Sequence, residues 1–300
     1  MGARPPRLRI WLMAVRPATL PAAVTGVVVG VGAALGSGAP LRIDTAAACL
    51  AVALLLQIAA NLSNDLFDFR RGADTAVRSG PVRVAAAGLV TERQLELAIA
   101  ITVGLAGVVG LWLVFVGGPL LLGLGILAVL AALAYTGGPW PYGYHGLGDV
   151  FVFAFFGLAA VVGTAYLQAA RVEPLYVAAA IPVGALTTAI LVVNNLRDIP
   201  TDRATGKRTL AVILGAGATK LEYALLLGVA FAVPLVLAAA GRQPWVLAPL
   251  AAFPLVMPLL GTVRGFADPR ELNPVLKGTA RLALVYGLLF AAGLATGTAT

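Results

Sequence analysis

The stretch NLSNDLFDFRRGAD (residues 61–74) directly follows AVALLLQIAA (residues 51–60), a segment without a single charge. Residues 61–74 contain three carboxylates, Asp65, Asp68 and Asp74, and two arginines, Arg70 and Arg71. Ionisable groups at the edge of a hydrophobic segment are costly to bury, so their first interpretation is a functional site. The question is therefore what these carboxylates bind.

The composition excludes a water-soluble protein. Apolar residues make up 60% of the 300 positions and charged residues only 11%, whereas soluble domains have about 45–50% and about 25%. Within lipid the backbone must pair with itself, which leaves helices or a closed barrel. The apolar runs are roughly 20 residues long and do not alternate, so they favour helices. We predict an all-α integral membrane protein with one transmembrane domain over residues 1–300.

Nine membrane spans are predicted from the hydrophobic runs. Pro17 and Pro21 should delay or kink the first span. The glycine-rich stretch GVVVGVGAALGSG (26–38) lacks the Lys-Ser/Thr ending of a phosphate loop, and its small residues should serve close helix packing. The predicted spans are 11–35, 43–60, 95–116, 119–136, 150–170, 175–194, 221–240, 245–264 and 281–298.

Basic residues predict the orientation. With the N-terminus in the cytoplasm, all but three of the 21 Lys and Arg residues lie on the inner side, the exceptions being Arg42, Arg171 and Arg242. We therefore expect a multi-pass protein of the bacterial inner or plasma membrane, with its site on the cytoplasmic side. The net charge of +8 suits anionic lipid head groups or an anionic substrate and makes nucleic acid an unlikely partner.

Two polar clusters follow the second and sixth predicted spans. If the second helix continues beyond residue 60, Asn61, Asn64, Asp65 and Asp68 share one face, since they are spaced i, i+3, i+4 and i+7. Since the second and sixth spans are each followed by a polar cluster, the chain resembles a weak internal repeat of helix pairs.

The second cluster lies in NNLRDIPTDRATGKRT (194–209). Asn194, Asp198 and Asp202 are spaced i, i+4 and i+8, with Asn195 beside them, and Pro200 should kink or end the helix. Each half of the chain thus offers carboxylates and amides on one helical face at the same membrane depth.

Carboxylates that face one another repel, so a cation must join them. Mg²⁺ is the natural ion, because it takes one or two carboxylates and completes its shell with substrate phosphate oxygens. Arg70, Arg71, Arg78, Lys207 and Arg208 would complement the remaining charge of a diphosphate. The pattern predicts a site for an amphiphile with a diphosphate head and a hydrocarbon tail. The alternative is that these charges are solvated and only set the topology, which two matching clusters disfavour.

The motifs resemble those of the UbiA-type membrane prenyltransferases, in which Asp-rich motifs follow the second and sixth helices, where NDLFD (64–68) and DIPTD (198–202) stand here. Within that family the chain is similar to the 1,4-dihydroxy-2-naphthoate polyprenyltransferases of menaquinone biosynthesis. The broad family often has an Asp where this chain has Gly72, and whether nearby Asp74 is a ligand stays open. The stretches that carry the closer resemblance are RPATLPAAV (16–24), NDLFDFRRGADT (64–75), YTGGPWPYGYHGLGDVFVF (135–153), NNLRDIPTDRATGKRTLAV (194–212) and LNPVLKGTARL (272–282).

This resemblance implies an enzyme in which Mg²⁺ is held by Asp65, Asp68, Asp198 and Asp202 and binds the diphosphate of a polyprenyl donor. Lys207, Arg78 and Arg208 would stabilise the departing diphosphate. The naphthoate would then attack at the carbon that bears its carboxylate, and loss of CO₂ would give demethylmenaquinol. Substrate contacts are predicted for Asn61, Asn64, Asn194, Asn195 and Arg78.

The aromatic loop GGPWPYGYHGLGD (137–149) has two interpretations. Trp140, Tyr142 and Tyr144 could form an interfacial belt, or the loop could cap the site, with Tyr135 or Tyr142 near the cation or the acceptor. His145 is predicted to be structural rather than a base.

Two further side chains complete the predictions. Asp149 is expected to pair with His145 or cap the next helix. Arg16 could hold the acceptor's carboxylate in a bidentate manner or only set the topology.

Two other functions remain open from the sequence. A prenyltransferase could use another acceptor, such as 4-hydroxybenzoate, homogentisate or a chlorin, but YTGGPWPYGYHGLGD (135–149) disfavours this. A secondary transporter would place its site at the bilayer midplane with broken helices. Here the ionisable residues cluster at one membrane edge, which disfavours a transporter.

Overall fold

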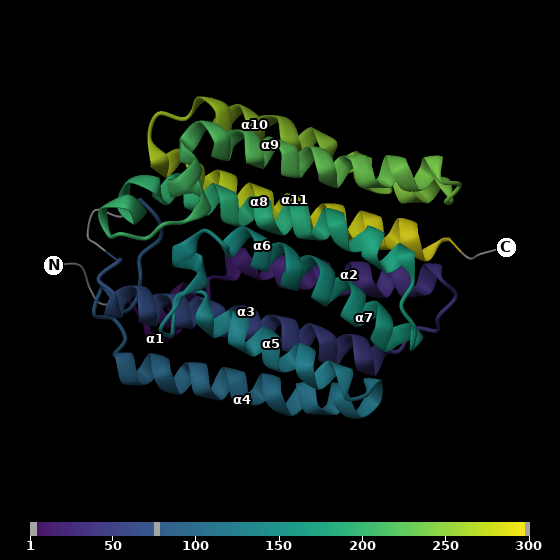
Figure 1. The fold of residues 1–300 in the computed structure, drawn as a ribbon, viewed down its shortest axis with the longest axis horizontal. Helices are drawn as coiled ribbons and strands as arrows, with labels where there is room; N and C mark the ends of the chain where they lie inside the picture. Colours follow the sequence, from purple (N-terminus) through teal and green to yellow (C-terminus); the bar gives the residue numbers. More distant parts are fainter. Residues whose placement is uncertain (1–4, 75–78, 298–300) are drawn as a thin grey trace.

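The computed structural model describes residues 5–74 and 79–297, and the regular secondary structure in this part of the chain is helical, without a strand. Five short helical segments, η1 to η5, separate or extend the eleven α-helices (Figure 1). The α-helices are α1 Arg7–Val15, α2 Leu20–Gly36, α3 Ile43–Arg70, α4 Glu92–Gly117, α5 Leu120–Ala134, α6 Gly148–Val152, α7 Ala160–Ala169, α8 Pro174–Ala204, α9 Leu210–Ala239, α10 Val256–Gly265 and α11 Leu272–Ala295. The short segments are η1 Pro17–Thr19, η2 Tyr142–His145, the π-helix η3 Phe153–Ala159, η4 Pro244–Leu255 and η5 Pro269–Glu271.

The predicted all-α membrane architecture is confirmed, but the number and bounds of the spans differ from the prediction. Among the described residues, eight helical stretches are long and apolar enough to cross a membrane. The predicted fourth span, 119–136, is the helix α5, but its 15 residues cover only about 22 Å at 1.5 Å per residue. That length falls short of a hydrocarbon core of about 30 Å.

The two helices that carry the polar clusters are longer than predicted. α3 continues from residue 60 to Arg70, and α8 continues from residue 194 to Ala204. Of the two outcomes expected at Pro200, an end of α8 is wrong, since the helix runs four residues further, and a kink stays a prediction. Thr201 and Thr205 donate their hydroxyls to the carbonyls of Asp198 and Thr201, which satisfies backbone groups near the proline.

Three other predicted spans are interrupted or shifted. The first breaks at Arg16 (φ 54°, ψ 69°), directly before Pro17, as the prolines predicted. The span 150–170 consists of α6, η3 and α7, with a π-helical turn in its middle. α9 begins at Leu210 rather than residue 221 and breaks at Gly215 (φ 80°), because glycine adopts a positive φ without steric cost.

α8 lies at the centre of the bundle and packs against α9, α11, α2, α6 and α7, with α11 alongside it in Figure 1. α4 packs on α3 at the periphery. Close packing of α2 depends on small residues, as predicted for the glycine-rich stretch. A Cβ on Gly32 would lie 2.5 Å from the carbonyl oxygen of Ala291 on α11.

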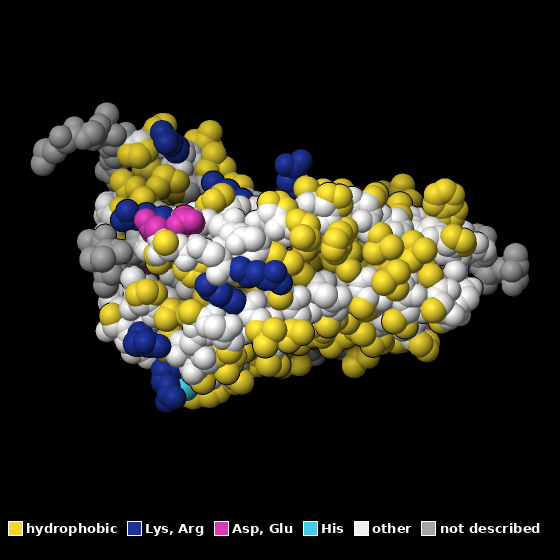
Figure 2. All heavy atoms as spheres, turned by 90° about the horizontal axis from the view of Figure 1, so that it is seen from above, with side chains coloured by type: hydrophobic (Ala, Val, Ile, Leu, Met, Phe, Trp, Pro, Cys, Tyr) yellow, Lys and Arg dark blue, Asp and Glu magenta, His cyan; other side chains and the backbone are white. Residues whose placement is uncertain are grey.

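The two ends of the bundle differ in chemistry. At one end, the turns after α2 and α7 are joined by Arg42, whose N–H donates to Gln168, and by Arg171, which donates to the carbonyl of Ser37. The opposite end carries the loops that follow α3, α5 and α8. Lys and Arg side chains gather toward that second end on the face seen in Figure 2, whereas the other half of this face is mainly apolar.

We expect Gly32→Ala to lower the stability by about 1–3 kcal/mol, because the new methyl group must displace the backbone of α11. Gly104→Ala on α4 is the matched control, since nothing lies within 4 Å of its added Cβ. Thermal unfolding in detergent measures both variants. Equal unfolding temperatures for the two variants would contradict the packing described for α2.

Candidate active site

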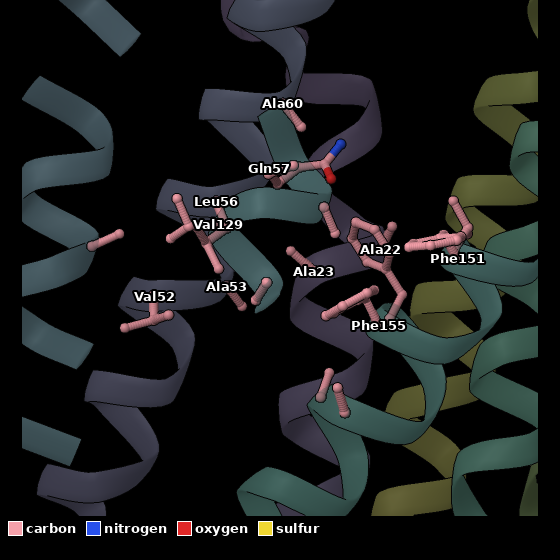
Figure 3. Close-up of a pocket in the computed structure, with 18 of the residues that line it drawn as sticks. Ala22, Ala23, Val52, Ala53, Leu56, Gln57, Ala60, Val129, Phe151 and Phe155 are labelled. Atoms are coloured by element: carbon pink, nitrogen blue, oxygen red, sulfur yellow. The ribbon is translucent and has the colours of Figure 1, made fainter. Parts of the chain in front are cut away.

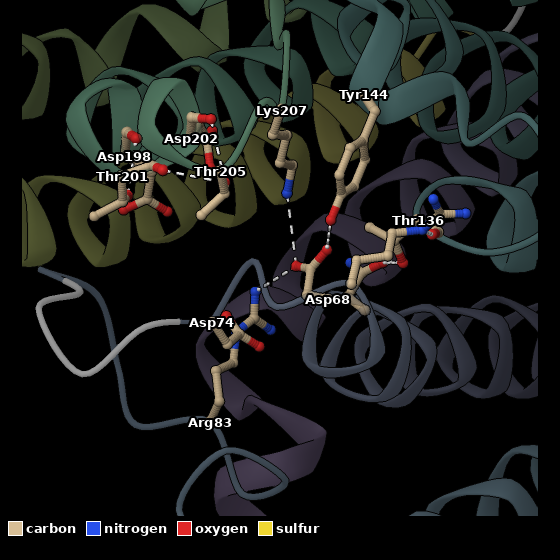
Figure 4. Close-up of polar contacts among 12 residues, drawn as sticks. Asp68, Asp74, Arg83, Thr136, Tyr144, Asp198, Thr201, Asp202, Thr205 and Lys207 are labelled. Carbon is tan, nitrogen blue, oxygen red and sulfur yellow. Dashed lines mark hydrogen bonds and ion pairs between the residues drawn. The ribbon is translucent and has the colours of Figure 1, made fainter.

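Asp68 lies at the centre of a polar cluster formed by segments far apart in the sequence (Figure 4). Its carboxylate accepts a hydrogen bond from the Tyr144 hydroxyl at 2.9 Å. Arg83 and Lys207 approach the other oxygen, at 3.3 Å and 3.6 Å. The Asp68 side chain is 2% exposed, so a negative charge here depends on these partners.

Tyr144 connects the aromatic loop to both acidic motifs. The Lys207 ammonium lies 5.0 Å and the Arg71 guanidinium 5.4 Å from its ring centroid, within the range of cation–π attraction. Burial, followed by the charge of Asp68 and with Asp202 contributing, raises the pKa of the Tyr144 hydroxyl. The hydroxyl therefore stays protonated as a donor. Tyr144 was assigned only to the interfacial belt or cap by the sequence, because spacing does not distinguish the tyrosines of this loop.

Asp65 holds the loop that follows α3. Its two carboxylate oxygens accept the backbone N–H groups of Val84 and Ala85, each at 3.2 Å. This contact fixes the neighbouring residue Arg83, whose Nε also lies 3.3 Å from Asp74. Arg83 was missed by the sequence analysis, since it lies 15 residues beyond Asp68 in an irregular segment and belongs to no helical pattern.

The second acidic motif is organised around Arg197, which is 1% exposed. Its guanidinium makes two hydrogen bonds to Asp198, at 2.8 and 2.7 Å, and one to Asn194 at 2.8 Å. Asn273 on α11 accepts the remaining bond at 3.0 Å and donates its own N–H to the carbonyl of Ser79. From the sequence, Arg197 is only one of the basic residues that predict the topology. No spacing rule predicted its contact with Asn273.

Several predicted substrate-binding residues have structural contacts. Asn64 accepts the Thr136 hydroxyl at 3.0 Å. The backbone N–H of Arg208 donates to the carbonyl of Tyr144 at 3.2 Å. Asp202 lies one turn beyond Asp198, and its carbonyl accepts the Lys207 N–H. Asn195 is buried, and Arg78 lies outside the described residues.

Arg70 and Arg71 were both predicted to complement the charge of a diphosphate, and the structure places them differently. Arg70 points away from the cluster and pairs with Glu92 and Glu96 on α4, so its expected role beside a diphosphate is not supported. Arg70 follows Asp68 by two residues, which turns its side chain by about 200° around the helix, so it faces α4 rather than the cluster. Arg71 does reach the site, where it donates to the carbonyls of Thr136 and Gly138.

The remaining aromatic-loop predictions are partly confirmed. His145 is structural as predicted: its Nδ1 lies 2.9 Å from the carbonyl of Pro141, and its ring stacks on Trp140. Tyr142 donates to the carbonyl of Ala131 and stacks on Phe151. Asp149 neither pairs with His145 among the described contacts nor caps a helix, because it lies inside the first turn of α6.

A cavity of about 610 Å³ opens beside the cluster. Most of its wall is apolar, contributed by α2, α3, α4, α5 and η3, and Figure 3 shows Val52, Leu56, Val129 and Phe155 on this wall. Tyr135 and Tyr142 also line it. Its polar lining residues are Arg16, Thr19, Gln57, Asn61, Asn64, Asp68, Arg83, Thr164, Thr187, Asn194 and Lys207. The combination suits a molecule with a charged head and a long apolar part.

The oxygen donors fit a hard cation that is shared with a ligand. Among the described residues, no group of three or more His, Cys, Asp or Glu side chains could hold a metal alone. Mg²⁺ in phosphate-binding sites uses one or two carboxylates together with substrate oxygens. Asp68 at the cavity wall, with Asp198 and Asp202 across the site (Figure 4), matches that requirement. Asp65 is already engaged in holding the loop.

Comparisons with known proteins agree with this geometry. The model of the UbiA prenyltransferase family matches residues 23–285. The chain is 43% identical to a 1,4-dihydroxy-2-naphthoate octaprenyltransferase of Mycobacterium tuberculosis, over 96% of this chain and 97% of the relative. It is 39% identical to the Escherichia coli protein of the same name, over 96% of each.

The fold is also shared with a solved structure. A UbiA homologue from Archaeoglobus fulgidus, bound to GPP and Mg²⁺, superposes with a TM-score of 0.66 at 16% identity. The match covers 94% of this chain and 99% of that chain. At this identity it establishes the common fold. The resemblance that the motifs predicted is confirmed.

Asn273 offers a test of the network around Arg197. Asn273→Asp keeps an acceptor for Arg197 but removes the donor to Ser79, so we expect faster amide exchange near Ser79 with little change in unfolding temperature. Asn273→Leu removes both contacts and should also destabilise the protein by about 1–3 kcal/mol, since a buried charged donor loses its partner. Hydrogen exchange and thermal unfolding distinguish the two. Unchanged exchange near Ser79 in both variants would contradict the network.

Proposed function

The chain belongs to the UbiA prenyltransferase family, and from that premise we propose that it transfers a polyprenyl group to 1,4-dihydroxy-2-naphthoate. The donor is a polyprenyl diphosphate, and the products are diphosphate, CO₂ and demethylmenaquinol. The observation that carries the proposal is the buried Asp68–Lys207–Arg83–Tyr144 cluster beside a mainly apolar cavity. The relatives named for the naphthoate reaction match this chain over nearly their full lengths.

The cluster supplies the means to bind a diphosphate. Without substrate, Lys207 and Arg83 neutralise Asp68. When a diphosphate enters, these cations turn toward its oxygens, and the charge that grows on it as the allylic C–O bond breaks is stabilised. Mg²⁺, found with GPP in the Archaeoglobus homologue, would be held by Asp68, Asp198 and Asp202 and would neutralise part of the diphosphate charge.

Tyr144 and Arg197 keep the carboxylates in position. The Tyr144 hydroxyl holds one oxygen of Asp68, and its ring carries the Lys207 ammonium on its face. Arg197 fixes Asp198 and Asn194 on the same turn of α8. Asp65 acts indirectly: its carboxylate accepts hydrogen bonds from the backbone next to Arg83 and so positions that arginine. A preorganised arrangement of this kind reduces the reorganisation needed during reaction.

The apolar cavity protects the reactive prenyl cation from water. Phe151, Tyr142 and Phe155 form a stacked aromatic row along its wall, and aromatic faces attract cations. The naphthoate ring carbon that bears the carboxylate forms the new C–C bond as diphosphate leaves. The electrons of its bond to the carboxyl group return to the ring when CO₂ departs.

The orientation follows from the same proposal. The basic end of the bundle faces the cytoplasm, where anionic lipid head groups attract Lys and Arg, and the protein resides in the inner or plasma membrane. A secondary transporter is the competing function from another class. It is disfavoured because the ionisable groups lie at one end of the cavity rather than midway along the bundle.

Asp68→Asn should reduce prenyl transfer by at least about a hundredfold, because the amide neither binds a cation comparably nor balances Lys207 and Arg83. Asp44→Asn is the matched control: Asp44 is on the same helix but near the opposite end. The assay measures prenylated product in membranes with equal amounts of each variant. Wild-type rates for Asp68→Asn would overturn the proposed role of this cluster.

The acceptor and the cation are tested together in membranes supplied with one polyprenyl diphosphate. We expect turnover of 1,4-dihydroxy-2-naphthoate and not of 4-hydroxybenzoate. Chelation of divalent ions should stop the reaction and added Mg²⁺ should restore it, since the diphosphate charge is otherwise uncompensated. Turnover of only the benzoate would refute the acceptor, and full activity under chelation would refute the metal.

A further inference from the structure

A further group of polar side chains lies on the cavity wall around Thr19, and it includes Asn61, the first residue of the polar face of α3. Thr19, in η1, donates its hydroxyl proton to the carbonyl of Arg16 at 3.0 Å. The same hydroxyl oxygen accepts N–H groups from the side chains of Gln57 at 3.1 Å and Asn61 at 2.9 Å, both on α3. All four residues line the cavity.

The hydrogen bonds of Thr19 determine the orientation of the side-chain amides of Gln57 and Asn61. A hydroxyl has one proton, and because the Thr19 proton goes to a carbonyl, its oxygen can only accept. The amide nitrogens of Gln57 and Asn61 must therefore face Thr19. Asn61 gives its other N–H to the carbonyl of Val15 at 2.9 Å, which uses both of its donors.

This arrangement leaves two oxygen acceptors for a ligand. Among the described residues, no group donates a hydrogen bond to the side-chain oxygen of Gln57 or Asn61. Figure 3 shows Gln57 extending from α3 at the level of Ala60, across from the small residues Ala22 and Ala23 of α2. A glutamine in an apolar, membrane-embedded helix is costly, so its polar end requires a partner.

The chemistry of these oxygens selects between the two substrates. Amide oxygens only accept hydrogen bonds and carry partial negative charge, so they disfavour a diphosphate, which offers further acceptors. A hydroxylated aromatic ring offers donors. Arg16 belongs to the same cluster through its carbonyl and also lines the cavity. Its guanidinium is the kind of group that pairs with a carboxylate in bidentate geometry.

We propose that Gln57 is a specificity-determining residue for the aromatic acceptor. Its side-chain oxygen accepts a hydrogen bond from the ring hydroxyl adjacent to the acceptor's carboxylate, while Arg16 binds that carboxylate. Thr19 is the positioning residue that turns both amides, and Asn61 supplies the second acceptor. The proposal rests on the proposed function and adds to it the part of the site that recognises the hydroxyl.

The test compares two ligands in wild type, Gln57→Met and Thr19→Val. One is 1,4-dihydroxy-2-naphthoate, and the other is 4-hydroxy-2-naphthoate, which lacks the hydroxyl next to the carboxylate. Dissociation constants are measured in detergent without prenyl donor, and KM for the prenyl diphosphate is measured separately. Thr102→Val is the matched control, because it makes the same change on α4 at a hydroxyl bonded only within its helix, outside the cavity lining.

Wild type should bind the dihydroxy ligand roughly five- to tenfold more tightly than the analogue, the usual net effect of one hydrogen bond. Gln57→Met should lose this preference while keeping the KM for prenyl diphosphate. Thr19→Val should reduce the preference for the dihydroxy ligand. Thr102→Val should behave as wild type. Gln57→Met with an undiminished preference, or with equal weakening of both ligands, overturns the assignment.

The same measurements distinguish a failure of the Gln57 assignment from a failure of the proposed function. If wild type turns over the naphthoate while Gln57→Met retains the preference, only the assignment of Gln57 fails. If wild type neither binds nor prenylates the naphthoate, the proposed function fails as well. Unfolding temperatures of both variants, compared with that of Thr102→Val, show whether a change in binding comes from lost folding instead.

Discussion

The structure depends on the compensation of a few charges buried at one end of an apolar bundle. Asp68 and Arg197 are each almost fully enclosed, and an isolated charge in such a setting costs several kcal/mol. Asp68 is balanced by Arg83 and Lys207 from two different loops. Arg197 is balanced by the adjacent Asp198 and also donates to Asn273, which links α8 to α11. The same groups that stabilise the fold at this end are those that meet an anionic substrate, so stability and binding share one set of contacts.

Much of this was predictable from the sequence because it depends on local periodicity. The i, i+3, i+4 and i+7 spacing of Asn61, Asn64, Asp65 and Asp68 places all four near one face of a helix, and α3 does continue through them. What spacing could not separate is the roles within that face. Asp68 meets the cavity, whereas Asp65, three residues earlier, is turned toward the backbone at Val84.

The groups that the sequence did not predict are brought in by long-range contacts. Tyr144 meets Asp68 across 76 positions, and Arg197 meets Asn273 across 76 positions as well. Neither contact follows a helical period, since each joins a loop or helix end to a distant element. Pro200 shows the opposite limit: α8 continues through it to Ala204, although local preference alone favours a kink or an end at a proline.

The cavity has opposite hydrogen-bond character in its two polar regions. Near Asp68, Lys207 and Arg83 present donors and positive charge, which suit phosphate oxygens. Near Thr19, the amide oxygens of Gln57 and Asn61 present acceptors, which suit hydroxyl protons. Because the first region suits a diphosphate and the second suits the hydroxyl groups of an aromatic acceptor, the two proposed substrates take different positions in one mainly apolar cavity. Their reacting carbons are thereby brought together between the regions, and this positioning lowers the entropic part of the barrier.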